Sequence, residues 1–337
     1  MEKEFQYEPD SRKKLEFGSA TLQKCILIIS SFIIVATIIM IMLLKTKRRA
    51  DTASKIGKSS SHQIDYPPGV RSATLNLQGG RYIELKSNIS KVYQIGQGVT
   101  VKEKNGHLIY VVKGKQTSGM LQELVVPFGS EYILDMADHT NVWLNSGSKL
   151  KYFSIYNFAV KFVWLEGQAH FRIKNPARQQ IQVMANGLSI QADCSEFAVD
   201  AYLSQYTRVY AYDGKVNIGR ENYVTTMSIH QDTILQGING LFSFVDVQFT
   251  EDIPTSVDGY FSFIRYSLRQ MTDELTRWYN VHFEFSDDFN VSNRIHSFIP
   301  REYSLQEILQ YLARDGLASF EVQKGRKVVV KPLKRRW

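Results

Sequence analysis

The chain has 337 residues, of which 44% are hydrophobic and 22% charged, so it can bury an ordinary core and is long enough for two or three domains. Its net charge of +8 comes from the two ends, since residues 59–323 carry 23 basic and 27 acidic side chains, and this composition excludes direct nucleic-acid binding by the body of the chain. The two cysteines, Cys25 and Cys194, lie far apart and exclude a disulfide framework and a zinc cluster.

The first predicted element is a transmembrane helix from Cys25 to Leu44. This stretch carries no charged residue, and twenty helical residues cover roughly 30 Å, the thickness of the hydrocarbon core of a bilayer. A signal peptide has a shorter apolar stretch followed by small residues, whereas a basic run begins here at Lys45. We therefore predict a short tail over 1–24, an anchor over 25–44 and a polar linker over 45–69. Basic residues flank both ends of the anchor, so the positive-inside rule gives no clear orientation.

Residues 70–247 are predicted to form an all-β domain. Short runs of alternating apolar and polar residues, such as Tyr82–Leu85 and Leu108–Val112, are separated by Gly, Asn and Asp. Runs of this kind about 8 to 12 residues apart, with no helical stretch between them, are typical of all-β domains. Trp143 and Trp164 fall on such strands and are predicted to face the core, because large aromatic side chains usually bury their area there.

Residues 255–332 are predicted to form a small α+β domain of two βαβ-like repeats. Ser267 and Ser304 each precede apolar residues at helical spacing and have a Gln or Glu three residues later, which is the sequence signature of a capping box. The second helix is expected to stop at Gly316. The two copies align at an offset of 37 residues, and Lys327–Val330 supplies a closing strand. The fold class is thus mainly β, with a small α+β domain and one N-terminal transmembrane helix.

Several segments of the chain, from the anchor to about Pro332, resemble the FecR-type transmembrane sensors. These segments are Pro127–Tyr132, Asp138–Tyr152, Leu165–Phe171, Tyr212–Val216, Val257–Phe263 and Arg277–Val281. The resemblance implies a single-pass protein of the bacterial inner membrane whose β-rich domain and C-terminal domain lie in the periplasm. The C-terminal domain would be similar to the short N-terminal domain of secretins and TonB-dependent receptors.

The resemblance also implies partners. Family members relay the state of an outer-membrane TonB-dependent receptor to an extracytoplasmic-function sigma factor, which they hold or activate in the cytoplasm. Relatives usually carry a helical sigma-binding domain before the anchor, whereas the tail over 1–24 is too short to bury a core. Either this tail acts as a linear peptide, or the sigma-binding function is lost, or the start codon is wrongly assigned.

Receptor docking is expected in the C-terminal domain, by addition of a strand at a sheet edge formed by Lys327, Val328, Val329 and Val330. Tyr279 is expected on the surface and is a further candidate docking residue, because Trp278 is predicted to take the core-facing position at the end of the first helix.

A second expectation concerns the step between Cys194 and Ser195. It matches the Gly-Thr step at which some members of the family cleave themselves. A serine hydroxyl could attack the preceding carbonyl, but the step lacks the backbone freedom of glycine. We therefore expect no cleavage there and expect Cys194 to be a small buried residue.

The sequence predicts neither an enzyme nor a cofactor site. The seven histidines show no metal-ligand spacing, and the chain has no nucleophile elbow, phosphate loop or zinc-protease motif. His170, His282 and His296 lie in strand-like segments, and Asp287-Asp288 is expected to be a solvated turn. The alternative to a signal transducer is a membrane-anchored structural or ligand-binding envelope protein without a regulatory role.

Overall fold

The computed structural model describes residues 64–114, 119–156, 160–176, 180–203, 206–220, 223–227, 232–236, 242–245, 256–287, 289 and 295–333. The chain divides into two units, residues 1–63 and residues 64–337. The tail, the predicted anchor from Cys25 to Leu44 and most of the predicted linker lie outside the described residues. Within the described ranges, no helix has the length and apolar character needed to cross a membrane.

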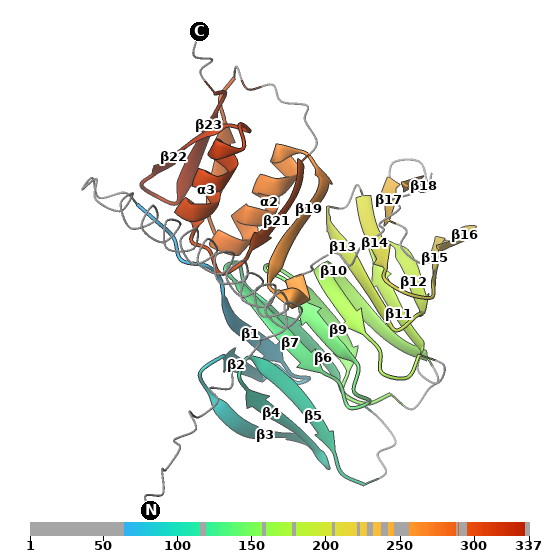
Figure 1. The fold of residues 1–337 in the computed structure, drawn as a ribbon. Coiled ribbons are helices and arrows are strands. Elements are labelled where there is room, and N and C mark those ends of the chain that lie inside the picture. The colour runs from blue at the N-terminus through green and yellow to red at the C-terminus, as the bar shows by residue number, and fades with distance from the viewer. Residues whose placement is uncertain are drawn as a thin grey trace, which may run out of the picture. The chain divides into compact units, whose positions relative to one another are not determined.

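The described part of residues 70–245, called the β body below, contains strands and no helix, as the sequence predicted (Figure 1). Its elements are β1 (Val70–Asn76), β2 (Tyr82–Lys86), β3 (Ser90–Gly96), β4 (Val99–Lys104), β5 (His107–Val112), β6 (Leu121–Val125), β7 (Ser130–Asp135), β8 (Asn141–Leu144), β9 (Lys149–Phe153), β10 (Val160–Arg172), β11 (Gln180–Ala185), β12 (Leu188–Asp193), β13 (Glu196–Leu203), β14 (Tyr206–Ala211), β15 (Lys215–Arg220), β16 (Tyr223–Met227), β17 (Asp232–Gln236) and β18 (Phe242–Val245).

The long strand β10 holds the β body together. Its first half pairs with β9 and β11, and its second half pairs with β8 and β13. The change of partners occurs at Gly167, which has φ +94°, a conformation that side chains disfavour. A Cβ at Gly167 would also lie 2.8 Å from the backbone of Ser148. Glycine therefore allows one strand to belong to two sets of pairings.

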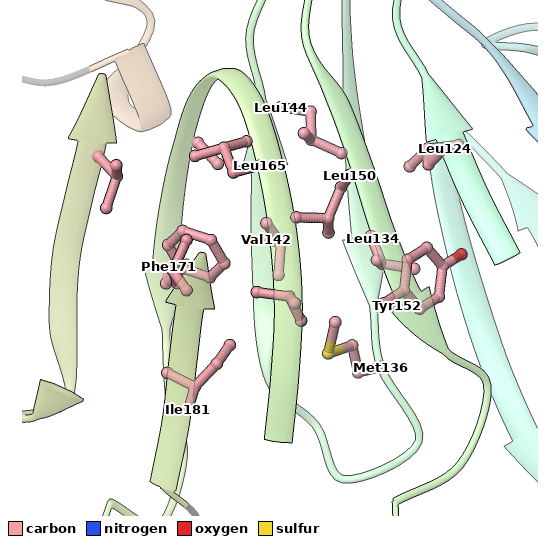
Figure 2. Packing of buried hydrophobic residues seen from close by; sticks show 14 of the residues in the cluster. Leu124, Leu134, Met136, Val142, Leu144, Leu150, Tyr152, Leu165, Phe171 and Ile181 are labelled. Atoms are coloured by element: carbon pink, nitrogen blue, oxygen red, sulfur yellow. The ribbon is translucent and has the colours of Figure 1, made fainter. Parts of the chain in front are cut away.

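The core of the β body lies between these two sets of strands, and Figure 2 shows part of it. Leu150 and Val163 come from one set, and Val142 and Phe171 come from the other, and all four side chains are fully buried. The ring of Phe171 stacks on Phe197 with centroids 4.8 Å apart. Burial of this continuous apolar cluster is the main contribution to the stability of the β body.

Residues 256–333, called the C-terminal module below, form the two predicted βαβ repeats. After a short 3₁₀ turn (Ser256–Asp258), the elements are β19 (Tyr260–Tyr266), α2 (Leu268–Tyr279), β20 (His282–Phe285), β21 (Ile295–Pro300), α3 (Leu305–Arg314), β22 (Ser319–Gln323) and β23 (Lys327–Lys331). The two predicted capping boxes, at Ser267 and Ser304, are present. Gly316 follows α3 with φ +76°, which confirms the predicted stop.

Each repeat contributes one strand to each of two small sheets. β19 pairs with β21, while the second sheet has the order β20-β23-β22. The helices and the two sheets share a core in which Phe263, Met271, Leu275, Ile308 and Leu312 are buried. The repeat offset read from the sequence therefore corresponds to a real structural duplication.

Two aromatic predictions for the β body differ from the structure. Trp164 is 41% exposed and Trp143 is half-buried, although both were expected in the core. The ring of Trp164 packs instead against Phe153 with centroids 6.3 Å apart. Strand alternation separates the two faces of a strand but does not say which one is inward. Around Trp164, the inward positions of β10 are taken by Val163 and Leu165.

Candidate functional site

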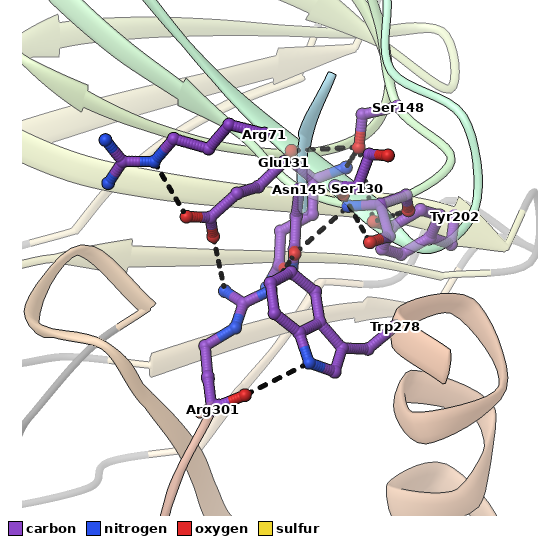
Figure 3. A network of polar contacts seen from close by, with 10 residues as sticks. Arg71, Ser130, Glu131, Asn145, Ser148, Tyr202, Trp278 and Arg301 are labelled. Atoms are coloured by element: carbon purple, nitrogen blue, oxygen red, sulfur yellow. Dashed lines mark hydrogen bonds and ion pairs between the residues drawn. The ribbon is translucent and has the colours of Figure 1, made fainter. Parts of the chain in front are cut away.

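Arg301 is the centre of a polar network between the β body and the C-terminal module (Figure 3). It follows β21 and is only 4% exposed. Its guanidinium donates to Asn145 Oδ1 at 2.6 Å and lies 3.5 Å from Glu131 Oε2. The Glu131 carboxylate also accepts from Arg71 Nε at 3.4 Å. One carboxylate thus joins an arginine of β1 to an arginine of the C-terminal module.

Trp278 lies against the same arginine. The Arg301 guanidinium is 3.8 Å from the centre of the indole ring, and the indole N–H donates to the Arg301 carbonyl at 3.3 Å. Phe261 meets the indole edge to face, with centroids 6.1 Å apart. A desolvated cation over a tryptophan ring contributes about 2 kcal/mol. The prediction that Trp278 faces the core is confirmed, and its ring also orients Arg301.

A second set of contacts links the last turn of α2 to the β body. Gly129 N–H donates to the Arg277 carbonyl at 2.8 Å, and the Arg277 guanidinium stacks on Tyr202 at 3.7 Å. The Tyr202 hydroxyl donates to the Ser146 carbonyl at 2.6 Å. These contacts and the Arg301 network together are called the junction below.

A cleft of about 390 Å³ lies beside the junction and is lined by residues of both parts, including Phe128, Asp200, Asp273 and Arg277. Burial raises the pKa of the Asp200 carboxyl, and the positive charge of Arg277 acts in the opposite direction. The lining of the cleft includes two acidic residues, Asp200 and Asp273, and two basic residues, Arg208 and Arg277. Across the described residues, no group of His, Cys, Asp and Glu side chains is arranged to hold a metal ion.

The strand Lys327–Val330 is not a sheet edge, contrary to the prediction. β23 pairs with β20 in parallel on one side and with β22 in antiparallel on the other. Its backbone N–H and C=O groups are therefore already used. β23 lies in the middle because β20, the last strand of the first repeat, and β22, the last strand of the second, pair with its two opposite sides. Local sequence does not reveal this pairing. β20 and β22 are the outer strands of this sheet.

Tyr279 is also not a surface residue. It is 1% exposed, and its hydroxyl donates to the Tyr303 carbonyl at 2.6 Å. Leu275 is buried, and both Trp278 and Tyr279 follow it at helical spacing, three and four residues later, so both rings can face the same core. Asn280, with φ +50°, then ends the helix.

The Cys194-Ser195 step lies in the turn between β12 and β13. Cys194 is 2% exposed, as predicted, and burial, with a smaller effect of the Asp213 charge, raises the pKa of its thiol to about 12. The Ser195 hydroxyl donates to Asp213 Oδ2 at 2.6 Å, and the same carboxylate accepts the backbone N–H of Glu196 at 2.7 Å. These bonds hold the turn in place. The expected absence of cleavage stays a prediction.

Sequence reasoning missed Arg301, Glu131 and Asn145. One signal was present: at the repeat offset of 37, Arg301 corresponds to Ile264 of the first copy. A charged residue at a position that is apolar in the sister repeat indicates a contact that only one copy makes. The partners of Arg301 are more than 150 residues away in the sequence, so local patterns could not identify them.

Comparisons with known proteins agree with the two parts of the fold. The family model described as FecR protein matches residues 122–217, and the one described as FecR, C-terminal matches residues 260–330. No curated protein matches the sequence. Two crystal structures, at 2.50 Å and 1.65 Å resolution, of a "putative anti-sigma factor" from Parabacteroides distasonis ATCC 8503 have a similar fold.

Both solved structures have a TM-score of 0.55 and 19% sequence identity to this chain. They cover 64% and 63% of this chain, and 100% and 99% of their own chains. This likeness concerns the fold, whereas the two family models match the sequence of part of the β body and of most of the C-terminal module, in the expected order. The chain therefore carries a FecR region and a FecR C-terminal region, in the order that the sequence resemblance implies.

Proposed function

We propose that the protein is an inner-membrane signal transducer, which relays the state of an outer-membrane TonB-dependent receptor to an extracytoplasmic-function sigma factor. The observation that carries this proposal is the presence of both FecR family regions in one chain, packed against each other through the junction. The fold of solved proteins described as anti-sigma factors supports a role in sigma-factor regulation. The apolar segment Cys25–Leu44 supplies the membrane anchor.

The receptor's signalling domain would dock on an outer strand of the β20-β23-β22 sheet. Strand addition uses backbone groups that a sheet edge leaves available, and this requirement moves the predicted docking strand from β23 to β20 or β22. Exposed ion pairs border both edges, Glu284 with Lys327 and Glu321 with Lys331. These charges allow each edge to be changed without touching the core.

Binding of the purified receptor signalling domain to the full chain in detergent tests the docking step. The variants Glu284→Arg and Glu321→Arg reverse a charge on β20 and β22. Glu166→Arg is the control, because it removes an exposed ion pair with Lys149 in the β body. We expect at least a tenfold loss of affinity in one of the two edge variants and no change in the control. Wild-type affinity in all three variants would exclude docking at these edges.

The regulatory role is tested in a strain that lacks the protein. We expect transcription from promoters of one extracytoplasmic-function sigma factor to stop responding to the receptor's ligand, and expression of the full chain to restore the response. Unchanged transcription would favour the alternative, a membrane-anchored structural or ligand-binding envelope protein.

Topology is tested separately by a reporter that is active only in the periplasm, fused after Trp337. Periplasmic activity is expected, because large translocated domains tolerate basic residues beside the anchor. Activity of the matching cytoplasmic reporter at the same position would exclude docking to an outer-membrane receptor.

A further inference from the structure

Residues 64–69, which the sequence assigned to the linker, lie against the C-terminal module. The Tyr66 carbonyl accepts a hydrogen bond from Leu305 N–H at 2.9 Å, and Asp65 Oδ1 accepts one from Gln306 N–H at 2.9 Å. Both donors are in the first turn of α3, where backbone N–H groups have no partner inside the helix. The negative charge of Asp65 is also favourable at the positive end of a helix dipole. Residues 64–69 are called the strap below.

The side chain of Tyr66 is held at the turn between β22 and β23. The Arg326 guanidinium lies 4.5 Å from the centre of the Tyr66 ring, and Arg326 N–H donates to the Tyr66 hydroxyl at 3.1 Å. The guanidinium also donates to the carbonyls of Tyr279 and Asn280 at the end of α2. One arginine therefore connects the strap, the β22–β23 turn and α2.

The strap then crosses Trp278 and enters the β body. Gly69 lies so close to the indole that an added Cβ would be 2.9 Å from two ring atoms. Val70 N–H donates to the Gly129 carbonyl at 2.9 Å, at the start of β1. Pro67 and Pro68 lie between Tyr66 and Gly69, and their fixed φ makes this stretch stiff. The two ends of the strap are thus joined by a segment that stretches little.

We propose that the strap couples the C-terminal module mechanically to the chain that precedes residue 64. A displacement of the module by a bound partner is then passed through Tyr66 and Asp65 to the adjoining N-terminal segment. This route does not require the β body to deform, because the strap contacts the module before it reaches β1. The inference rests on the proposed signalling function and specifies how the signal leaves the C-terminal module.

The contacts between the strap and the C-terminal module are of a kind that binding of a partner can break and re-form. They include two hydrogen bonds at exposed positions, from Gln306 to Asp65 and from Arg326 to Tyr66, and one cation–π contact at the edge of the module. The strap contributes Tyr66 to the border of the module core, where its ring is partly buried. A substitution at Tyr66 is therefore expected to free the strap without unfolding the module.

The test compares Tyr66→Ala with the conservative variant Tyr66→Phe and with the control Tyr82→Ala, which removes a tyrosine that is 66% exposed on β2. All are made in the full chain. The first readout is hydrogen exchange at the amides of Leu305, Gln306 and Arg326. We expect exchange at these amides to be at least tenfold faster in Tyr66→Ala and unchanged in Tyr82→Ala. Tyr66→Phe keeps the ring but lacks the hydroxyl that accepts from Arg326 N–H, so it should restore protection at Leu305 and Gln306 and leave Arg326 in fast exchange.

The second readout is the transcriptional response to the receptor's ligand. Tyr66→Ala is expected to bind the receptor domain with wild-type affinity. Its transcriptional response to the receptor's ligand is expected to be at least tenfold weaker than that of the wild type. If the wild-type chain responds and Tyr66→Ala responds equally, the coupling role of the strap is wrong although the signalling function stands. If the wild-type chain gives no transcriptional response, both the signalling function and the role of the strap are wrong. Unchanged amide exchange in Tyr66→Ala would contradict the assigned contacts of the strap, whatever the transcriptional response.

Discussion

The substitution Arg301→Ala tests the junction most directly. It removes the hydrogen bond to Asn145 at 2.6 Å, the ion pair with Glu131 at 3.5 Å and the stacking of the guanidinium on Trp278 at 3.8 Å. It leaves the indole hydrogen bond in place, because the acceptor of that bond is the backbone carbonyl of residue 301. The substitution therefore measures the contribution of the Arg301 side chain separately from that of the backbone after β21.

The expected cost follows from burial. Removing one partner of a buried charge pair costs about 3–5 kcal/mol, chiefly because the other partner is left without compensation. Glu131 keeps Arg71 as a partner at 3.4 Å, so the loss falls at the lower end of this range. The lost contact with the indole adds to the cost, whereas relaxation of the cavity reduces it. We expect Arg301→Ala to lower the free energy of unfolding by about 3 kcal/mol.

Equilibrium urea unfolding, followed by tryptophan fluorescence, measures this loss in the full chain. Arg314→Ala is the matched control, since Arg314 is exposed at the end of α3, and we expect it to change the free energy by less than about 0.5 kcal/mol. A double-mutant cycle with Asn145→Ala should show a coupling of about 1–3 kcal/mol. A loss below about 1 kcal/mol for Arg301→Ala, or no coupling to Asn145, would refute the assigned role of the network.

Three further outcomes can be measured in the same way. Ser267→Ala removes a capping box and should cost about 1 kcal/mol in urea unfolding, so an unchanged midpoint would contradict the assigned cap. Phe171→Ala opens a cavity in the core of the β body and should cost about 3–5 kcal/mol, whereas a loss under 1 kcal/mol would place the core elsewhere. The hydrogen bond from His170, and secondarily Arg172, lowers the pKa of Glu196 to about 2 from an ordinary value of 4.5. The pair therefore stabilises the fold above about pH 4.5 and loses this effect as the pH falls towards 2. Glu196→Gln should flatten the pH dependence of stability over this window, and an unchanged profile would contradict the pairing.

The C-terminal module was readable from the sequence because its signals are local. Each capping box spans four residues, Gly316 marks a helix end by itself, and the repeat offset compares two nearby segments. The all-β character of the β body was equally local, since alternation is a property of each run. These features depend on neighbouring residues, which are fixed by the order of the chain.

Two of the predictions that differed required knowledge of distant partners, and the third concerned the end of one helix. Lys327–Val330 has the composition of a strand, but its central place depends on β20 and β22 arriving on either side. Trp164 alternates correctly, but its outward direction depends on which face of β10 meets the opposite strands. Tyr279 was assigned to the surface because Trp278 was given the core-facing position at the end of α2, whereas the module buries both rings. In each case the helix or strand was predicted correctly, but the burial or pairing of its residues was not.

The junction explains why the two FecR regions occur in one folded unit. Residues 64–337 form a single compact unit, and Arg301 is a buried charge of the C-terminal module whose carboxylate and amide partners belong to the β body. A buried arginine without these partners would be strongly destabilising. Gly129 adds a backbone link in both directions, accepting from Val70 and donating to Arg277. The start of β1, the β body and the end of α2 therefore meet at this one place.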